Sequence, residues 1–263
     1  LSSGTAALHV LALALNWSKK DIIITTPITF LASANCILYS GARPDFVDIN
    51  KNSFTIDVNK LESKIKYYKK IGKNIKAVIG VDYAGNPCDW SSLRYLANKY
   101  NFTLINDNCH AIGSKYKNNK KYAIKYADFV THSYHPAKNI TSGEGGAILT
   151  NSKFFKNKFD QLRSHGVNKK LKKKSGLWEY EMQNLGFNYR ITDIQCALGI
   201  SQLQSLEKKI QKRRLLAKNY DKAFQKNSNF IIPQSSKQSY HSYHIYPLQF
   251  CFNEKGVNKK LFF

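Results

Sequence analysis

Short apolar runs alternate along this chain with longer stretches in which apolar residues recur at helical spacing. Helical patterns follow Asp57 and Asp89, each of which is suited to cap the helix after it. Strands that alternate with amphipathic helices predict an α/β sandwich around a mostly parallel sheet. The runs with the composition of strands buried on both faces are 22–26, 77–81, 103–106 and 129–133.

A further strand and a long helix are expected in the second half of the chain. Residues 147–150 form an apolar run after a glycine-rich turn at 143–146. Thr192 and Gln195 have the spacing of a capping box, in which two backbone N–H groups of the first helical turn are bonded reciprocally. The helix that they open carries these candidate core contacts: Ile194, Leu198, Ile200, Leu203 and Leu206.

The pattern changes where this helix becomes strongly basic, at Lys208–Arg214. We therefore expect a large domain over residues 1–208 and the beginning of a smaller α+β domain over 209–263, with its first strands at 230–233 and 244–252. The chain starts without Met at a turn and stops in mid-pattern. Both domains are thus expected to be incomplete, as parts of a longer protein.

Positive charge is the most unusual feature of the composition: 41 Lys and Arg against 17 Asp and Glu give a net charge of +24. Such a surface is typical of proteins that bind nucleic-acid phosphates. Here the basic residues are spread through the chain, and Asn, Ile, Tyr and Phe are abundant too, as an AT-rich genome would favour. The densest run, Lys169–Lys174, falls in an expected loop. We expect no nucleic-acid partner, and a field that favours an anionic small substrate.

The location of the protein is indicated by two features. No apolar run is long enough to span a bilayer, and the apolar segment 6–15 follows a small-residue turn rather than a basic leader. The five cysteines are odd in number and scattered, which argues against a disulfide framework and fits a reducing compartment. These features predict a cytoplasmic protein without a membrane partner.

Three segments carry groups suited to chemistry. Ser2–Leu8 combines small residues with a helix start, which favours a phosphate but would also serve as an ordinary cap. Asp107 follows an apolar strand at the edge where open α/β sheets bind ligands, although it could equally cap the next helix. Lys138 lies in a loop after Ser133, where a pocket that lowers its pKa would suit Schiff-base chemistry. A lysine taken singly in such a chain is far more often on the surface.

A metal site is an alternative use of the same region. His132 and His135 are three residues apart, and Cys109 and His110 lie upstream. Zinc sites usually have tighter paired spacing and a further pair of ligands, neither of which is evident here. We therefore expect no metal.

The order of these segments adds information that none of them provides alone. The chain resembles the fold-type-I pyridoxal-phosphate (PLP) enzymes, and more narrowly the DegT-type sugar aminotransferases. This resemblance implies a three-layer sandwich of the aspartate aminotransferase type, with PLP as the cofactor. The matching strings are SGTAAL at 3–8, GARPDFVDI at 41–49, Asp107-x-x-His110-Ala111-x-Gly113, Lys138 with GEGG at 143–146, and GFNYR at 186–190.

The resemblance implies a role for each candidate residue around the cofactor ring. Lys138 would carry PLP as a Schiff base and move the proton between substrate and cofactor. Asp107 would keep the pyridine nitrogen protonated, which makes the ring a better electron sink. His110 would contact the ring and its phenolic oxygen. Phe30 would stack on the other face, although core packing is the alternative for a Phe after a strand.

The phosphate and the subunit arrangement follow from the same resemblance. The backbone of Gly4 and Thr5 and the hydroxyl of Ser133 would hold the phosphate. Asn188 matches a residue that reaches the phosphate from the partner subunit, which implies a homodimer. Arg190 lies in the same loop and is given no role, because a structural ion pair would explain it equally well.

A narrower resemblance concerns the substrate. TTPITF at 25–30, VDYAG at 81–85 and RSHG at 163–166 are similar to the transaminases of pseudaminic acid synthesis. Glutamate would then donate the amino group, and the C4 ketone of a UDP-linked 4-keto-6-deoxy amino sugar would receive it. GDP- and dTDP-linked keto sugars stay open, as does a PLP-fold protein that binds or regulates without catalysis. Lys138 argues against the related sugar dehydratases, in which histidine typically replaces the lysine.

Overall fold

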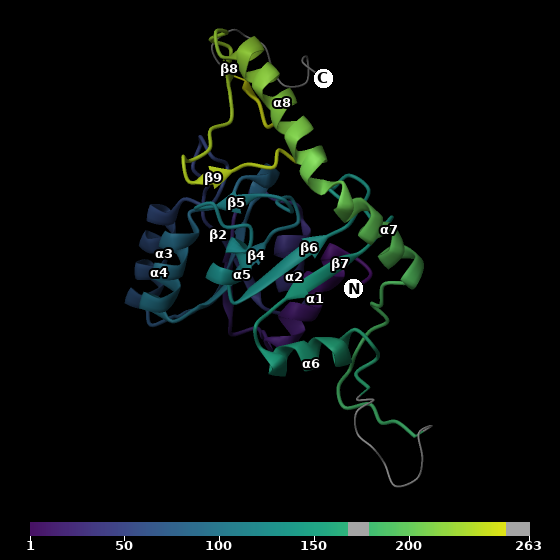
Figure 1. Cartoon of the computed structure of the whole chain (residues 1–263). Coiled ribbons are helices and arrows are strands. Elements are labelled where there is room, and N and C mark those ends of the chain that lie inside the picture. The colour runs from purple at the N-terminus through teal and green to yellow at the C-terminus, as the bar shows by residue number, and fades with distance from the viewer. Residues whose placement is uncertain (168–178, 251–263) are drawn as a thin grey trace, which may run out of the picture.

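Figure 1 shows the computed structural model of the chain, which describes residues 1–167 and 179–250. A six-stranded sheet forms its centre, in the order β2-β1-β3-β4-β6-β7, and all neighbouring strands are parallel except β6 and β7. The expected mostly parallel sheet is therefore confirmed. Its strands are β1 (Ile22–Thr25), β2 (Arg43–Phe46), β3 (Ile75–Val81), β4 (Thr103–Asp107), β6 (Phe129–Ser133) and β7 (Gly146–Leu149).

Helices cover both faces of the sheet and make three layers (Figure 1). Successive side chains of a strand point to opposite faces, so Ile23 and Ile24 of β1 belong to different buried cores. This explains why the strands appear in the sequence as continuous apolar runs. The core that contains Ile24 is closed by α3 (Val58–Lys70), α4 (Trp90–Tyr100) and α5 (Tyr122–Tyr126), and the core that contains Ile23 by α1 (Gly4–Ala14), α2 (Ala32–Tyr39) and α6 (Lys153–Leu162).

The predicted helix caps are confirmed. The carboxylate of Asp57 accepts hydrogen bonds from two backbone N–H groups at the start of α3, and Asp89 accepts one at the start of α4. Thr192 and Gln195 form the expected capping box at the start of α7 (Asp193–Gln204). Each cap satisfies N–H groups that have no partner inside the helix, so these starts were readable from local sequence.

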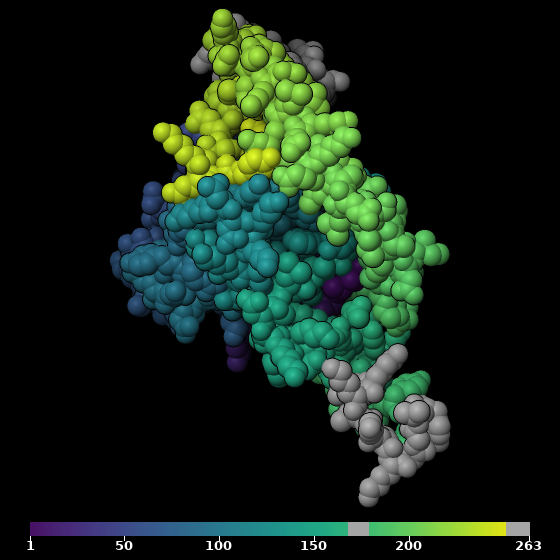
Figure 2. Space-filling view, viewed as in Figure 1, coloured from purple at the N-terminus to yellow at the C-terminus, as the bar shows by residue number. Residues whose placement is uncertain are grey.

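The core contacts expected for the helix after Thr192 are wrong. No residue of α7 is buried, and Ile194 and Ile200 are 85% and 61% exposed. Leu206 is half-buried and begins a separate helix, α8 (Leu206–Phe224), directly after Ser205. The physical reason is that α7 runs along the outer edge of the molecule, where the described part of this chain leaves its apolar side chains uncovered (Figures 1 and 2).

The last described elements lie partly apart from the main sheet. β8 (Phe230–Ile231) pairs with β10 (Gln249–Phe250) in a small antiparallel sheet, and each strand lies within one of the expected ranges, 230–233 and 244–252. In the sequence between β8 and β10, β9 (Ser239–Tyr240) pairs with β5 (Lys115–Tyr116), which belongs to the part of the chain that forms the large sheet. The residues that follow β9 are consequently packed against the loops at the carboxyl ends of the strands.

Two further expectations concern the basic run and membrane-spanning segments. The basic run Lys169–Lys174 lies outside the described residues. Along the described ranges, no helix combines the length and the apolar character needed to cross a bilayer.

Candidate active site

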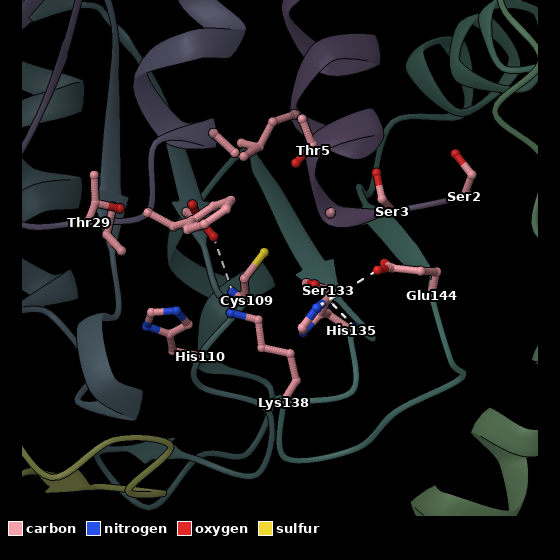
Figure 3. A pocket seen from close by; sticks show the side chains of 16 residues that line it. Ser2, Ser3, Thr5, Thr29, Cys109, His110, Ser133, His135, Lys138 and Glu144 are labelled. Atoms are coloured by element: carbon pink, nitrogen blue, oxygen red, sulfur yellow. Dashed lines mark hydrogen bonds and ion pairs between the residues drawn. The ribbon is translucent and has the colours of Figure 1, made fainter.

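The loops at the carboxyl ends of the parallel strands and the start of α1 surround one cavity of about 400 Å³ (Figure 3). In open α/β sheets this edge is where ligands bind, because the connections diverge there and leave a crevice. All but one of the candidate residues line this cavity: Gly4, Thr5, Phe30, Asp107, His110, Ser133 and Lys138. The exception, Asn188, is exposed and bridges to Ser164 instead.

The start of α1 lies unusually close to the end of β6. A Cβ atom on Gly4 would lie 2.7 Å from the Cβ of Ser133, which only glycine avoids. Ser3 caps the helix and its hydroxyl accepts the N–H of Ala6, as the cap interpretation predicted. Within the described residues, the N–H groups of Gly4 and Thr5 have no acceptor. The helix therefore offers free donors and its positive dipole end beside the Ser133 hydroxyl.

Asp107 lies at the wall of the cavity and is only 5% exposed. Its Oδ2 accepts a hydrogen bond from the hydroxyl of Ser33 at 2.6 Å, and its Oδ1 accepts the backbone N–H of Cys109 at 3.2 Å. The residues after Asp107 form a turn, and no helix begins there. The alternative in which this carboxylate is a helix cap is therefore wrong, and its free acceptor capacity borders the cavity.

His110 is buried, and its imidazole ring is in the neutral form. Its Nδ1 accepts the backbone N–H of Ala84 at 3.2 Å, so the neutral ring carries its proton on Nε2. Burial lowers the pKa of His110 to about 2, and the positive charge of Lys138 acts in the same direction. The ring of His244 packs against it with the ring centroids 4.4 Å apart.

Lys138 is half-buried and points into the cavity towards Cys109 (Figure 3). Its loop is held by His135, whose carbonyl accepts the Lys138 N–H at 2.9 Å and whose Nδ1 accepts the Ala137 N–H at 3.1 Å. Burial lowers the pKa of Lys138, although nearby Cys109 and Asp107 oppose the shift. A surface role for this lysine is therefore wrong, and a larger fraction of its amine is unprotonated and nucleophilic.

Phe30 is 63% exposed and lines the cavity, so the core-packing alternative for this residue is wrong. An exposed aromatic ring beside a cavity leaves one face available to a flat ligand. Arg190 is also exposed, in the same loop as Asn188, and no role is assigned to it.

Several residues around the cavity were missed by sequence reasoning. Ser33 bonds to Asp107, and Thr29 bonds to Ser33; both residues follow β1. His244 comes from the segment that returns after β9, and Glu144 faces His135 across the cavity mouth at 3.9 Å (Figure 3). None of these residues has a local pattern that marks it, apart from the position of Ser33 in an otherwise mostly apolar helix.

The metal alternative gains no geometric support. Among residues 1–167 and 179–250, no three His, Cys, Asp or Glu side chains are placed to hold a metal ion. His132 and His135 lie on and after β6 respectively, and only His135 lines the cavity.

Comparison with known families places almost the entire chain. Residues 1–262 match the DegT/DnrJ/EryC1/StrS aminotransferase family. The chain belongs to this family. A relative within it, from Campylobacter jejuni, is named UDP-4-amino-4,6-dideoxy-N-acetyl-beta-L-altrosamine transaminase. It is 42% identical over 248 residues, which cover 94% of this chain and 63% of the relative. This chain therefore spans less than two thirds of the relative's length.

Solved structures of family members share the fold. PseC of Helicobacter pylori, described as an aminotransferase involved in the biosynthesis of pseudoaminic acid, matches with a TM-score of 0.83 and 36% identity, over 100% of this chain and 66% of that one. The sugar aminotransferase Spr1654 of Streptococcus pneumoniae, solved in a PLP form, matches with a TM-score of 0.80 and 28% identity, over 95% and 65%. The expected fold class, that of PLP-dependent sugar aminotransferases, is confirmed.

Proposed function

We propose that this protein is a PLP-dependent aminotransferase that moves an amino group from glutamate to the C4 ketone of a UDP-linked 4-keto-6-deoxy amino sugar. The observation that carries the proposal is the shared cavity, which combines a lysine of lowered pKa, a buried carboxylate and the two N–H groups left without an acceptor at the start of α1. Membership of an aminotransferase family supports the reaction type.

The residues around the cavity fit PLP in charge and shape. A phosphate suits the uncapped N–H groups of Gly4 and Thr5 with the adjoining Ser133 hydroxyl, where the missing side chain of Gly4 permits close approach. The exposed ring of Phe30 suits one face of a flat heterocycle, and His110 suits a contact on the other side. A solved relative in a PLP form supports the same cofactor.

The chain's own groups then divide the chemistry. PLP, when bound, supplies an electron sink for electrons released at the substrate carbon. Lys138 would hold the cofactor covalently and, as a free amine, would move the substrate proton, a role that its lowered pKa favours. Asp107 would hold a proton on the ring nitrogen through its remaining acceptor capacity. Neutral His110 donates from Nε2 and adds no positive charge to the site.

The substrate class is supported by similarity and charge. A relative named as a transaminase of a UDP-linked amino sugar is 42% identical to this chain. A net charge of +24 favours the approach of a diphosphate. GDP- and dTDP-linked keto sugars are the alternative substrates, and direct comparison of the three nucleotide sugars in a transamination assay separates them.

We also propose that the enzyme is a homodimer in which Asn188 serves the neighbouring active site. Asn188 does not line the cavity of its own chain, and the nearby helix α7 exposes a row of apolar side chains that a second copy would cover. Ile194→Asp is therefore expected to shift the mass in solution, measured by light scattering, towards the monomer. An unchanged mass would contradict this arrangement.

Two further expectations are kept as proposals. The division into a large domain over 1–208 and the beginning of a small one over 209–263 is supported by the separate β8–β10 sheet. A cytoplasmic location is supported by Cys36, Cys88, Cys109 and Cys196, which are all free thiols.

The test of the proposed function is the visible absorption spectrum of the natural full-length protein with added PLP, recorded before and after glutamate. We expect a yellow band that glutamate bleaches as the cofactor takes up the amino group. A band that glutamate leaves unchanged would favour a PLP-binding or regulatory protein, and the lack of any band would refute the cofactor assignment.

A further inference from the structure

A chain of two hydroxyl groups connects the cavity surface to the carboxylate of Asp107. Ser33, on α2, is fully buried, and its Oγ lies 2.6 Å from Oδ2 of Asp107. Thr29 lines the cavity, and its Oγ1 lies 2.9 Å from Oγ of Ser33. The two residues of the short bond are separated by 74 positions in the sequence, so only the packing of α2 onto the sheet brings them together.

The direction of these hydrogen bonds follows from the number of protons available. An ionised carboxylate only accepts, so the single hydroxyl proton of Ser33 is directed at Asp107. Ser33 then has lone pairs but no further proton, and the hydroxyl of Thr29 must donate to it. The order is therefore Thr29 to Ser33 to Asp107, with each donation polarising the next.

The 2.6 Å separation falls in the range of charge-assisted O–H···O⁻ bonds, which are about twice as strong as neutral ones. Such a bond fixes the rotation of the Asp107 carboxylate. Cys109 approaches the same carboxylate through its backbone N–H, at a longer 3.2 Å, and through its thiol. Ser33 therefore makes the shorter of the two hydrogen bonds measured to Asp107 and is a strong restraint on the orientation of its carboxylate.

We propose that Ser33 is a positioning residue that acts through Asp107, with Thr29 as its own donor from the cavity wall. The inference rests on the proposed function, in which Asp107 keeps a proton on the ring nitrogen of PLP. A carboxylate held in one orientation can face the ring nitrogen and stabilise its proton, whereas a carboxylate free to rotate does so less well. Removal of the Ser33 hydroxyl therefore lowers the affinity for the cofactor and reduces the positive charge on its ring.

The experiment compares three variants of the natural full-length protein. Ser33→Ala removes the direct donor, and Thr29→Val removes only the donor behind it. Ser63→Ala is the matched control, because Ser63 is an exposed helical serine whose hydroxyl bonds only to the backbone carbonyl of Asn59. The readouts are the dissociation constant of PLP, the pH at which the visible cofactor band changes, and the thermal midpoint without PLP.

We expect Ser33→Ala to raise the dissociation constant of PLP by about tenfold, as expected for loss of a bond to a charged group. The pH midpoint of the visible band should rise, because a less positive ring favours the proton on the Lys138 nitrogen. Thr29→Val should shift both quantities in the same direction by a smaller amount, and Ser63→Ala should shift neither.

Two outcomes overturn the proposal. If Ser33→Ala changes only the thermal midpoint, with PLP affinity and band midpoint equal to the control, Ser33 is merely structural. If Ser33→Ala does not fold, Thr29→Val decides alone, and unchanged affinity and band midpoint reject the inference. A failure of the proposed function is distinguishable, because the unsubstituted protein would then show either no PLP band or a band that glutamate leaves unchanged.

Discussion

Two carboxylates at neighbouring strand ends have opposite surroundings. Asp82 follows β3 and Asp107 ends β4, and the Asp82 N–H donates to the Asp107 carbonyl at 3.1 Å. Asp82 is 0% exposed, whereas Asp107 borders the cavity and accepts from the Ser33 hydroxyl and the Cys109 N–H. The donors to the Asp82 carboxylate are the Cys88 N–H, the Trp90 Nε1–H, the Asn106 and Asn108 side-chain amides and the Tyr122 hydroxyl.

The difference lies in how much acceptor capacity each carboxylate has left. A carboxylate offers about four lone-pair sites, so the surroundings of Asp82 use all of them. Burial raises the pKa of Asp82 to about 6, even though its hydrogen-bond donors act in the opposite direction. Asp107 keeps acceptor capacity on a wall that a ligand can reach. Residue type and position along the strand are similar, so saturation of lone pairs separates the structural carboxylate from the functional one.

The largest expected effect is in the cavity that Asp107 borders. Lys138→Ala should reduce transamination at least about a thousandfold while the fold is retained, because the nucleophile and proton carrier are lost together. Activity and circular dichroism would be measured beside Lys66→Ala, which changes a 62% exposed lysine. An active Lys138→Ala enzyme would remove the proposed mechanism.

Asp107→Ala should lower transamination by about a hundredfold and retain part of the PLP binding, because electrostatic support of the ring is lost. The phosphate contacts at the start of α1 do not depend on this carboxylate. Steady-state rates and the PLP dissociation constant are the measurements. Full activity would mean that Asp107 is as structural as Asp82, and the comparison would fail.

Asp82→Asn should act on stability instead. The amide presents N–H groups to donors that need an acceptor, and we expect a loss of about 3 kcal/mol in the free energy of unfolding. Asp89→Asn is the control, since asparagine caps helices as well as aspartate does. Urea unfolding and the activity of the folded fraction would be measured. A stable but inactive Asp82→Asn enzyme would contradict the division of roles.

The smallest effect concerns buried histidines. Burial lowers the pKa of His110 to about 2 and that of His241 to about 3. Because these folded-state pKa values lie below the unfolded value, both rings contribute stability above pH 6.5 that is lost as the pH falls.

As the pH falls from about 7.5 to about 5.5, each of these histidines should lower the free energy of unfolding by roughly 1.4 kcal/mol. His241→Gln should remove the contribution of one histidine to this loss, measured as the pH dependence of urea unfolding. An identical pH dependence in this variant would show that His241 takes up its proton without unfolding the region.

Local chemistry explains which parts of the fold were predictable. Strands, caps and the turn before β7 depend on side chains within a few residues of each other, so the pattern around Asp57, Asp89 or Thr192 was sufficient. The apolar row on α7 was interpreted as core because periodicity reports that a face is apolar and not what covers it.

The sequence by itself determined the alternation of strands and helices, the helix starts, the strand-end position of Asp107 and the loop position of Lys138. The tertiary structure alone decided which distant side chains meet: Ser33 with Asp107, and His244 with His110. It also decided which of two similar aspartates keeps free acceptor capacity. The physical reason is that burial, hydrogen-bond saturation and pKa depend on neighbours in space, whereas periodicity and capping depend on neighbours along the chain.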